Sequence, residues 1–329
     1  MAYDGRIMQR ALTRFDEDKQ RRAAQLEQRR RTAYARAPRL AEIEAELRGT
    51  MGRIISSALA RGTDPVPAIR VLRDENLQLQ RERAELLASL GYPADYLEEK
   101  PACDKCGDTG YVSGGVCACL RAYYAREQLA ELSRLLPLGE DSFETFSFDW
   151  YDSAVQPAFG ISPRENMEHN YDVCRDYAYQ FAKGSGDLLL SGGTGLGKTF
   201  LSACIARVVS ENGFSVVYDT AASVFSRFED AKFRRDDGGS EDADRCMRCD
   251  LLILDDLGTE MTTSFVQSAL YQIVNGRLMA GRSTIISTNL APEEIGSRYG
   301  RSVLSRLEGE YEILPFFGED IRRLKRERQ

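Results

Sequence analysis

The feature that most constrains this chain is a glycine-rich loop between an apolar run and a second apolar stretch at helical spacing. The run is residues 188–190, and the helical stretch is residues 200–206. The loop reads Gly192, Gly193, Thr194, Gly195, Leu196, Gly197, Lys198 and Thr199. A strand, such a loop and a helix in this order predict a phosphate-binding loop, because backbone N–H groups and the helix N-terminus attract an anion. The chain is therefore predicted to bind a nucleoside triphosphate, with Lys198 on the β- and γ-phosphates and Thr199 on Mg²⁺.

Two later predicted strands end in polar residues that suit the same ligand. Residues 251–254 lead into Asp255 and Asp256. Asp255 is expected to hold Mg²⁺, and Asp256, where a glutamate is commoner, is the candidate general base for the attacking water. Residues 283–288 lead into Asn289, whose amide can sense the γ-phosphate and orient that water. Together these motifs predict a site that hydrolyses the bound triphosphate.

Three arginines follow these runs, at Arg298, Arg301 and Arg306. A guanidinium can bind a phosphate through two hydrogen bonds. When a neighbouring subunit supplies it, the site is complete only after the subunits assemble. The Ser305-Arg306-Leu307 context favours Arg306, which predicts self-association through Arg306 in trans. A surface ion pair is the alternative for each arginine.

Four cysteines lie close together before the phosphate-binding loop, at Cys103, Cys106, Cys117 and Cys119. They supply the number of thiolates that a closed tetrahedral Zn²⁺ site needs, and glycines between them permit tight turns. The spacing predicts structural Zn²⁺, with a redox C-x-x-C pair or unconnected thiols as the alternatives. His169 is expected on the surface rather than among the ligands. A second pair, Cys246 and Cys249, runs into the strand before Asp255 and is expected to be structural.

Residues 1–98 predict helices without a catalytic signature. Residues 6–37 are charge-dense, and Pro38 ends the helix that they predict. Two further helices follow, the last over residues 68–90. Asn76 and Arg83 occupy heptad positions between its spaced leucines, which argues against a dimeric coiled coil and favours an intramolecular hairpin. We interpret the region as an arm that binds a protein partner, with a solvated spacer as the alternative.

Composition excludes some classes of protein. A net charge of −7 argues against non-specific coating of nucleic acid, although it allows a local basic groove. The sequence has no apolar run of the ~18 residues that a transmembrane helix needs. Its first residues lack the apolar centre of a signal peptide. These features predict a cytoplasmic protein that makes no use of a membrane.

The motifs together resemble the AAA+ ATPases of the DnaC/DnaI helicase-loader family and are similar to the IstB transposition helpers. The likeness covers roughly residues 90–325 and includes the phosphate loop, Asp255-Asp256-Leu-Gly-Thr-Glu260, Asn289, Ser305-Arg306-Leu and the cysteine cluster. It implies an α/β fold: a P-loop AAA+ parallel sheet flanked by helices, lacking a C-terminal lid. An all-α N-terminal region and a small zinc module would precede this sheet. The implied division is residues 1–98 as a helical partner-binding arm, 99–136 as the zinc module with a connecting helix, and 137–329 as the ATPase domain.

The resemblance also implies an activity. It is ATP-dependent loading of a replicative DnaB-type helicase hexamer onto single-stranded DNA during replication, with slow, assembly-dependent ATP hydrolysis. Two alternatives remain open: an IstB-like transposition helper and an ATP-gated adaptor whose hydrolysis is irrelevant. The chain departs from the family pattern in its all-cysteine cluster and at Ser302, where an arginine is common, so that Arg298 or Arg301 would substitute. Arg322 is a candidate second sensor.

Residues 218–250 match the position where the initiator and loader proteins insert an extra helix that grips single strands. Lys232, Arg234 and Arg235 are the candidates for backbone contacts with single-stranded DNA. The neighbouring Phe225 and Phe228 suit stacking on bases or burial in a core equally well. Residues 236–244 are acidic and are expected to form a flexible loop. Four aromatic residues before the core either lie beside the adenine base or hold the first helix in place: Phe143, Phe146, Phe148 and Trp150.

Overall fold

The computed structural model describes residues 3–59, 66–135, 142–233 and 237–328. The chain forms two compact units, one made of Met1–Leu12 with Ala118–Gln329 and the other of Thr13–Cys117. The domain boundaries expected from the sequence, at residues 98 and 136, separate parts of the chain by their expected roles rather than by compactness. They stay a prediction.

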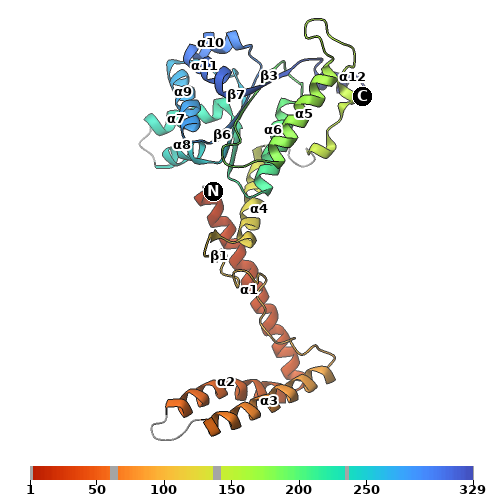
Figure 1. Cartoon of the computed structure of the whole chain (residues 1–329), viewed down its shortest axis with the longest axis vertical. Helices are drawn as coiled ribbons and strands as arrows, with labels where there is room; N and C mark the ends of the chain where they lie inside the picture. The colour runs from red at the N-terminus through yellow and green to blue at the C-terminus, as the bar shows by residue number, and fades with distance from the viewer. Residues whose placement is uncertain (1–2, 60–65, 136–141, 234–236, 329) are drawn as a thin grey trace. The chain divides into compact units, whose positions relative to one another are not determined.

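The larger unit is built on a five-stranded parallel sheet in the order β4-β5-β6-β3-β7 (Figure 1). The strands are β3 (Asp187–Gly192), β4 (Val216–Thr220), β5 (Leu251–Leu257), β6 (Ser283–Thr288) and β7 (Tyr311–Phe316). Most of their residues are buried, because parallel strands are covered on both faces and therefore read as continuous apolar runs. The runs before the phosphate loop, Asp255 and Asn289 are confirmed as β3, β5 and β6. They stand next to one another in the sheet.

Helices cover both faces of this sheet. They are α4 (Ala118–Leu135), α5 (Pro163–Tyr179), α6 (Lys198–Glu211), α7 (Ala221–Phe233), α8 (Asp237–Arg248), α9 (Ser264–Met279), α10 (Pro292–Tyr299), α11 (Arg301–Glu310) and α12 (Ile321–Glu327). Short 3₁₀ turns lie at η1 (Phe143–Thr145) and η2 (Phe148–Trp150). Leu188 and Leu190 join a core formed with α4, α5 and α6, whereas Leu189 joins a second core with α7 to α11. Successive side chains thus enter opposite layers, as strand geometry requires.

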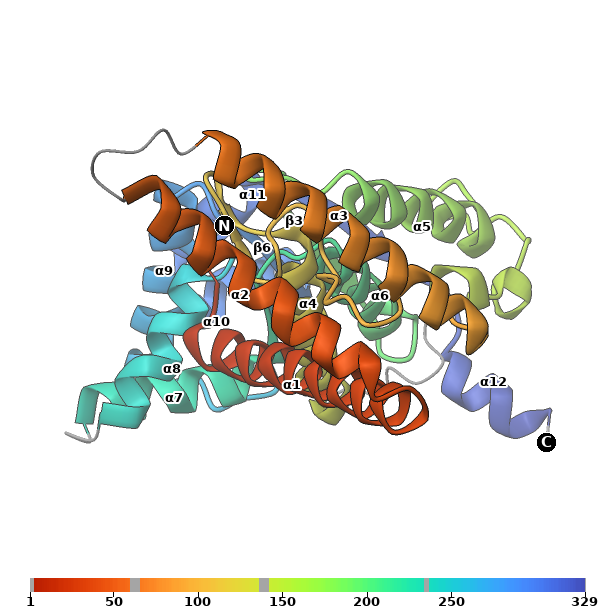
Figure 2. The ribbon, with the colours of Figure 1, turned by 90° about the horizontal axis from the view of Figure 1, so that it is seen from below.

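Three helices dominate the amino-terminal part: α1 (Gly5–Arg36), α2 (Arg39–Leu59) and α3 (Val66–Ser89). The last two lie side by side in Figure 1 and Figure 2, which confirms the intramolecular hairpin. Its base is closed by buried residues from each helix and the chain after α3: Ala33, Leu40, Leu87 and Leu97. The helix α3 ends before Gly91, whose positive φ of 79° provides the left-handed helix end that glycine favours. The hairpin β1 (Tyr111–Val112) and β2 (Gly115–Val116) lies between the cysteine pairs.

The first turns of α1 belong to the larger unit. Ile7 and Ala11 are buried there, and Arg10 forms an ion pair with Glu131 of α4. Asp4, just before the helix, pairs with Arg245 of α8. Apolar burial and partly exposed charge pairs therefore anchor the start of α1 on the unit that holds the parallel sheet.

The acidic stretch at 236–244 corrects one expectation, because the part of it that is described is helical rather than a flexible loop. It forms most of α8, which packs on α7 and α9. Cys246 on this helix is fully buried in the second core. Packing of an apolar edge thus outweighs the helix-weakening Asp and Gly residues. None of the helices in the described ranges is long and apolar enough to span a bilayer.

Candidate nucleotide-binding site

The phosphate loop joins β3 to α6 and leaves no room for side chains at two of its glycines. A Cβ atom on Gly192 would lie 1.9 Å from the carbonyl oxygen of Phe316, and one on Gly195 would lie 1.9 Å from a carboxylate oxygen of Asp320. Both glycines have positive φ, at 147° and 70°. The N–H of Ile321 donates to the Gly195 carbonyl at 3.0 Å. The segment between β7 and α12 therefore packs against the phosphate loop. The sequence motif of the loop does not predict this contact.

Lys198 is the first residue of α6, and its ammonium group is held inside the loop. It donates to the carbonyls of Gly192 and Gly193, both at 2.6 Å, and to the side-chain oxygen of Asn289 at 2.7 Å. Burial lowers the pKa of Lys198 from 10.5 to about 8, although the carboxylates of Asp256 and Asp255 oppose this shift. The structure thus brings together two predicted residues from β3–α6 and the end of β6.

The two carboxylates at the end of β5 lie beside this lysine. The Thr199 hydroxyl is 3.5 Å from an oxygen of Asp255, which is 4% exposed. This hydroxyl and carboxylate are the oxygen ligands that Mg²⁺ prefers, and their proximity fits a shared ion. Asp256 has a left-handed φ of 55°, and burial followed by the charge of Asp255 raises its pKa. A residue in that conformation is strained, a property that clusters at functional sites.

A cavity of about 510 Å³ lies at this place. It is lined by the phosphate-loop residues 194–199, by Asp256 and Asn289, and by the aromatic residues Phe146, Trp150 and Tyr151. Arg322 and Lys325 of α12 line it as well. The cavity has the size and mixed polar and aromatic lining that suit a nucleotide. Phe143 is buried in the core, whereas Phe146 and Trp150 pack on the core and also line the cavity, so that a place for them beside the adenine base stays a prediction.

The three candidate arginines behave differently from one another. Arg298 donates to the carbonyl of Gly258 at 2.6 Å, in the loop that follows the carboxylates. Arg306 lies 3.9 Å from Glu310 on α11 with 43% of its side chain exposed, and Arg301 is exposed at the start of the same helix. The residues that line the cavity include none of the three. Action of Arg306 on a neighbouring subunit stays a prediction.

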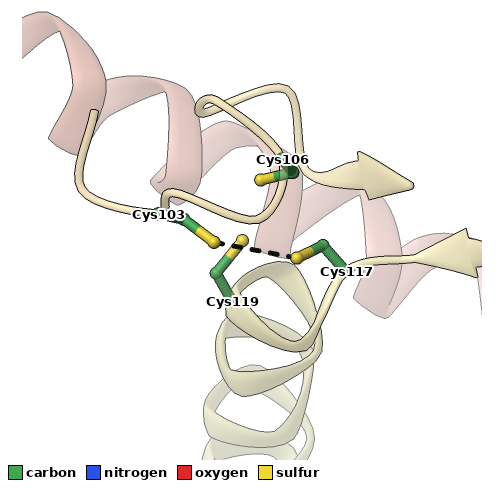
Figure 3. Close-up of side chains that lie close together, drawn as sticks. All are labelled: Cys103, Cys106, Cys117 and Cys119. Atoms are coloured by element: carbon green, nitrogen blue, oxygen red, sulfur yellow. Dashed lines mark hydrogen bonds between the residues drawn. The ribbon is translucent and has the colours of Figure 1, made fainter. Parts of the chain in front are cut away.

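The four cysteine sulfurs form a separate cluster, in which all lie within 4.8 Å of one another and turn toward a common centre (Figure 3). The sulfurs of Cys103 and Cys117 are 3.8 Å apart. This equals the edge of a tetrahedron with Zn–S bonds of about 2.3 Å, so the donor set fits Zn²⁺. Asp108 accepts the N–H groups of Ala102 and Cys103, both at 3.0 Å, and an Arg22 guanidinium at 2.8 Å. This carboxylate shapes the first cysteine turn.

The candidates for single-stranded DNA are only partly described. Lys232 is exposed at the end of α7, with its ammonium 5.4 Å from the centre of the Phe265 ring. Arg234 and Arg235 lie outside the described residues. Phe225 and Phe228 are buried in the second core, at 3% and 8% exposure, so they serve packing rather than base stacking. His169 is exposed on α5, as expected.

Sequence reasoning missed several residues around the site. Tyr218 of β4 and Ser287 of β6 both contact Asp255. Lys325 lines the cavity, and Trp150 packs under Lys325 and Arg328, with cation–ring distances of 5.6 Å and 4.5 Å. A hydroxyl within a buried strand was the available signal for Tyr218 and Ser287. The contact of α12 with Trp150 carries no local signal, since it depends on tertiary packing.

The five-stranded parallel sheet, the phosphate loop and the polar strand ends define an ATP-binding protein of the AAA+ class. The profile of the family described as "IstB-like ATP binding protein" matches residues 173–329. This part of the chain, somewhat less than half of it, is therefore similar to the IstB-like ATP-binding proteins.

Individual relatives cover a similar part of the chain. The uncharacterized protein YdaV of Escherichia coli K12 is 31% identical over 161 residues, which are 45% of this chain and 64% of YdaV. The replicative helicase loader DnaC of the same strain is 30% identical over 145 residues, 44% of this chain and 58% of DnaC. The chain thus spans less than two thirds of either relative. A crystal structure of the DnaC helicase loader superposes with a TM-score of 0.46 and 19% identity, over 55% of this chain and 99% of that one.

Proposed function

We propose that this chain is an ATP-hydrolysing helicase loader, which places a ring-shaped replicative helicase on single-stranded DNA. The observation that carries the ATPase part is the cavity that gathers Lys198, Thr199, Asp256 and Asn289 next to Asp255. The helicase part is supported by the relatives named replicative helicase loaders. The helical hairpin of α2 and α3 supports a protein-binding arm, since Val71 and Leu77 are 58% and 46% exposed on it.

Each residue of the site has a chemical role in this proposal. Lys198 leaves its carbonyl partners to neutralise the β- and γ-phosphates, while Thr199 and Asp255 would hold Mg²⁺, which supplies further neutralising charge when bound. Asp256 accepts the proton of the attacking water, and its raised pKa makes it a stronger base than an ordinary carboxylate. Asn289 orients this water. Arg306 from a neighbouring copy would complete the charge neutralisation, which makes hydrolysis depend on assembly.

The test uses the full chain with the purified replicative helicase of the same organism and a single-stranded DNA circle. We expect ATP-dependent transfer of the helicase to the circle, and a strong loss of helicase binding in the double variant Val71→Glu, Leu77→Glu. Val155→Glu is the matched control, because Val155 is 60% exposed on the other unit. Absence of helicase binding by the unaltered chain would overturn the loader proposal.

Asp256→Asn separates hydrolysis from binding in the same assay. Loss of the general base should lower turnover by about 10²- to 10⁴-fold while ATP binding persists. If helicase delivery continues without turnover, the chain is an ATP-gated adaptor. The similarity of residues 173–329 to the IstB-like proteins favours one more candidate, a transposition helper. Binding to a transposase in place of the helicase would support that function.

A further inference from the structure

We propose that Tyr218 and Ser287 are positioning residues that hold the two catalytic carboxylates, one from each strand beside β5. This inference adds to the ATP site proposed above. Its expectations for turnover rest on the proposed hydrolysis, whereas its expectations for Mg²⁺ do not. The strand β5 lies between β4 and β6 in the sheet. Its end is therefore reached by side chains from both neighbours.

An irregularity in the pairing of β5 with β6 sets up this arrangement. Leu254 pairs with Ile286, but the next pair is Leu257 with Thr288. Asp255 and Asp256 thus stand opposite the single residue Ser287, which is a β-bulge. Bulges redirect side chains and often lie next to active sites. The left-handed φ of 55° at Asp256 belongs to the same distortion.

The Ser287 hydroxyl contacts both residues of the bulge. It accepts the backbone N–H of Asp256 at 2.9 Å and donates to one carboxylate oxygen of Asp255. Ser287 is fully buried, so water cannot replace either contact. The hydroxyl of Ser287 therefore holds the backbone that orients Asp256, the proposed general base. It also holds the carboxylate of Asp255, which would bind the metal.

Tyr218 holds the other oxygen of Asp255. Its phenol donates to that oxygen at 2.6 Å, and the tyrosine is 4% exposed. A tyrosine phenol keeps its proton at physiological pH and therefore remains a donor. With both oxygens held, Asp255 cannot rotate, and a metal ligand fixed in this way loses less freedom on binding.

The two residues have distinguishable effects, because Tyr218 reaches only Asp255 whereas Ser287 reaches both carboxylate residues. In the full chain, Tyr218→Phe should weaken the response of ATP affinity to Mg²⁺ by about 10- to 100-fold, the usual cost of losing an outer-shell partner. Its turnover at saturating Mg²⁺ should stay within about threefold of the unaltered chain. Ser287→Ala should lose the Mg²⁺ response and, in addition, lower turnover at saturating Mg²⁺ by at least tenfold. Ser287→Thr, which keeps the hydroxyl, should restore both.

The experiment measures ATP binding calorimetrically over a Mg²⁺ titration, with EDTA as the metal-free state, and turnover separately. Ser283→Ala and Tyr311→Phe are matched controls, because both remove a buried hydroxyl near the opposite end of the sheet strands. A purely structural role would weaken ATP binding equally with and without Mg²⁺, and would overturn the proposal. So would Tyr218→Phe and Ser287→Ala variants that keep the full Mg²⁺ response. If the unaltered chain binds Mg²⁺·ATP but does not hydrolyse it, the proposed hydrolysis is wrong. The expected effect of Tyr218 and Ser287 on the Mg²⁺ response is not affected by that outcome.

Discussion

At the scale of single residues, Lys198 links ATP binding to pH. Burial lowers its pKa from 10.5 to about 8, while the phosphates of ATP bind its protonated form. Above pH 8 the nucleotide-free protein must take up a proton to bind ATP. We expect ATP affinity to be flat from pH 6.5 to 7.5 and to fall above pH 8, by at most about tenfold per pH unit. Calorimetry in buffers of different ionisation enthalpy would detect the proton uptake directly.

The same residue changes stability in the opposite direction. Between pH 8 and 10.5 the unfolded chain binds more protons at this lysine than the folded protein does, so its contribution to the free energy of unfolding rises with pH. Lys198→Met is the control that removes both effects. An ATP affinity that stays constant up to pH 9.5 would contradict this account of Lys198.

The sequence was sufficient to predict the site residues that belong to motifs. It was insufficient to predict the residues that hold those site residues in place. Lys198, Asp255 and Asn289 were predicted because each follows a predicted strand in a recognised order, and the structure brings them close together. Tyr218 and Ser287 were not predicted, since their contacts depend on strand order and on a bulge. No local sequence pattern specifies that two residues of β5 will face one of β6.

At the scale of elements, Arg277 explains why the acidic segment at α8 is ordered. This side chain of α9 is fully buried. It donates to the carbonyls of Cys246 and Cys249 at 2.7 Å and 3.1 Å, and to Ser283 and Thr284 of β6 at 2.6 Å and 3.0 Å. One guanidinium thus ties the end of α8 to α9 and the sheet. The second cysteine pair is structural, as expected, and burial raises the pKa of both thiols.

Arg277→Ala should lower the free energy of unfolding by about 3–5 kcal/mol, because it leaves several buried acceptors without a donor. Arg207→Ala is the control, since Arg207 forms an exposed pair with Glu211 on α6 and should change stability by less than about 1 kcal/mol. Urea denaturation followed by circular dichroism gives both values. Equal stability of the two variants would show that α8 is held by its apolar contacts alone.

A second link between elements joins the loop after Asp256 to the helices α10 and α11, which carry Arg298 and Arg306. Glu260 accepts the backbone N–H of Gly258 at 3.1 Å and the phenol of Tyr299 on α10. Arg298 of the same helix donates to the Gly258 carbonyl. The chain after Asp256 is thus bound to α10, which packs on α11.

At the scale of the whole molecule, the parallel sheet class and the helical hairpin were predictable because each rests on the pattern of apolar residues along whole segments. The buried start of α1 was not predictable, since the packing of Ile7 and the pairing of Asp4 with Arg245 join residues far apart in the sequence. A charge-dense helix gives no indication that its first turns will be buried. The helix α1 therefore begins within the unit that holds the parallel sheet and continues into the other unit.

Variants of Arg306 test whether the protein acts as an assembly of subunits. An arginine that acts in trans leaves ATP binding to its own subunit intact but deprives the neighbouring site of a charge worth about 10³-fold or more in turnover. Arg306→Ala should therefore bind ATP and fail to hydrolyse it, and Lys198→Met should also be inactive because its own phosphate loop lacks the ammonium. A mixture of the two variants should regain part of the activity. In mixed assemblies, the Arg306 of a Lys198→Met subunit can reach the ATP site of an Arg306→Ala subunit, whose own Lys198 is intact. Arg207→Ala, which removes an arginine from a similar exposed pair with Glu211 on α6, is the matched control and should remain active alone. A mixture without activity, or full turnover by Arg306→Ala, would remove Arg306 from the site.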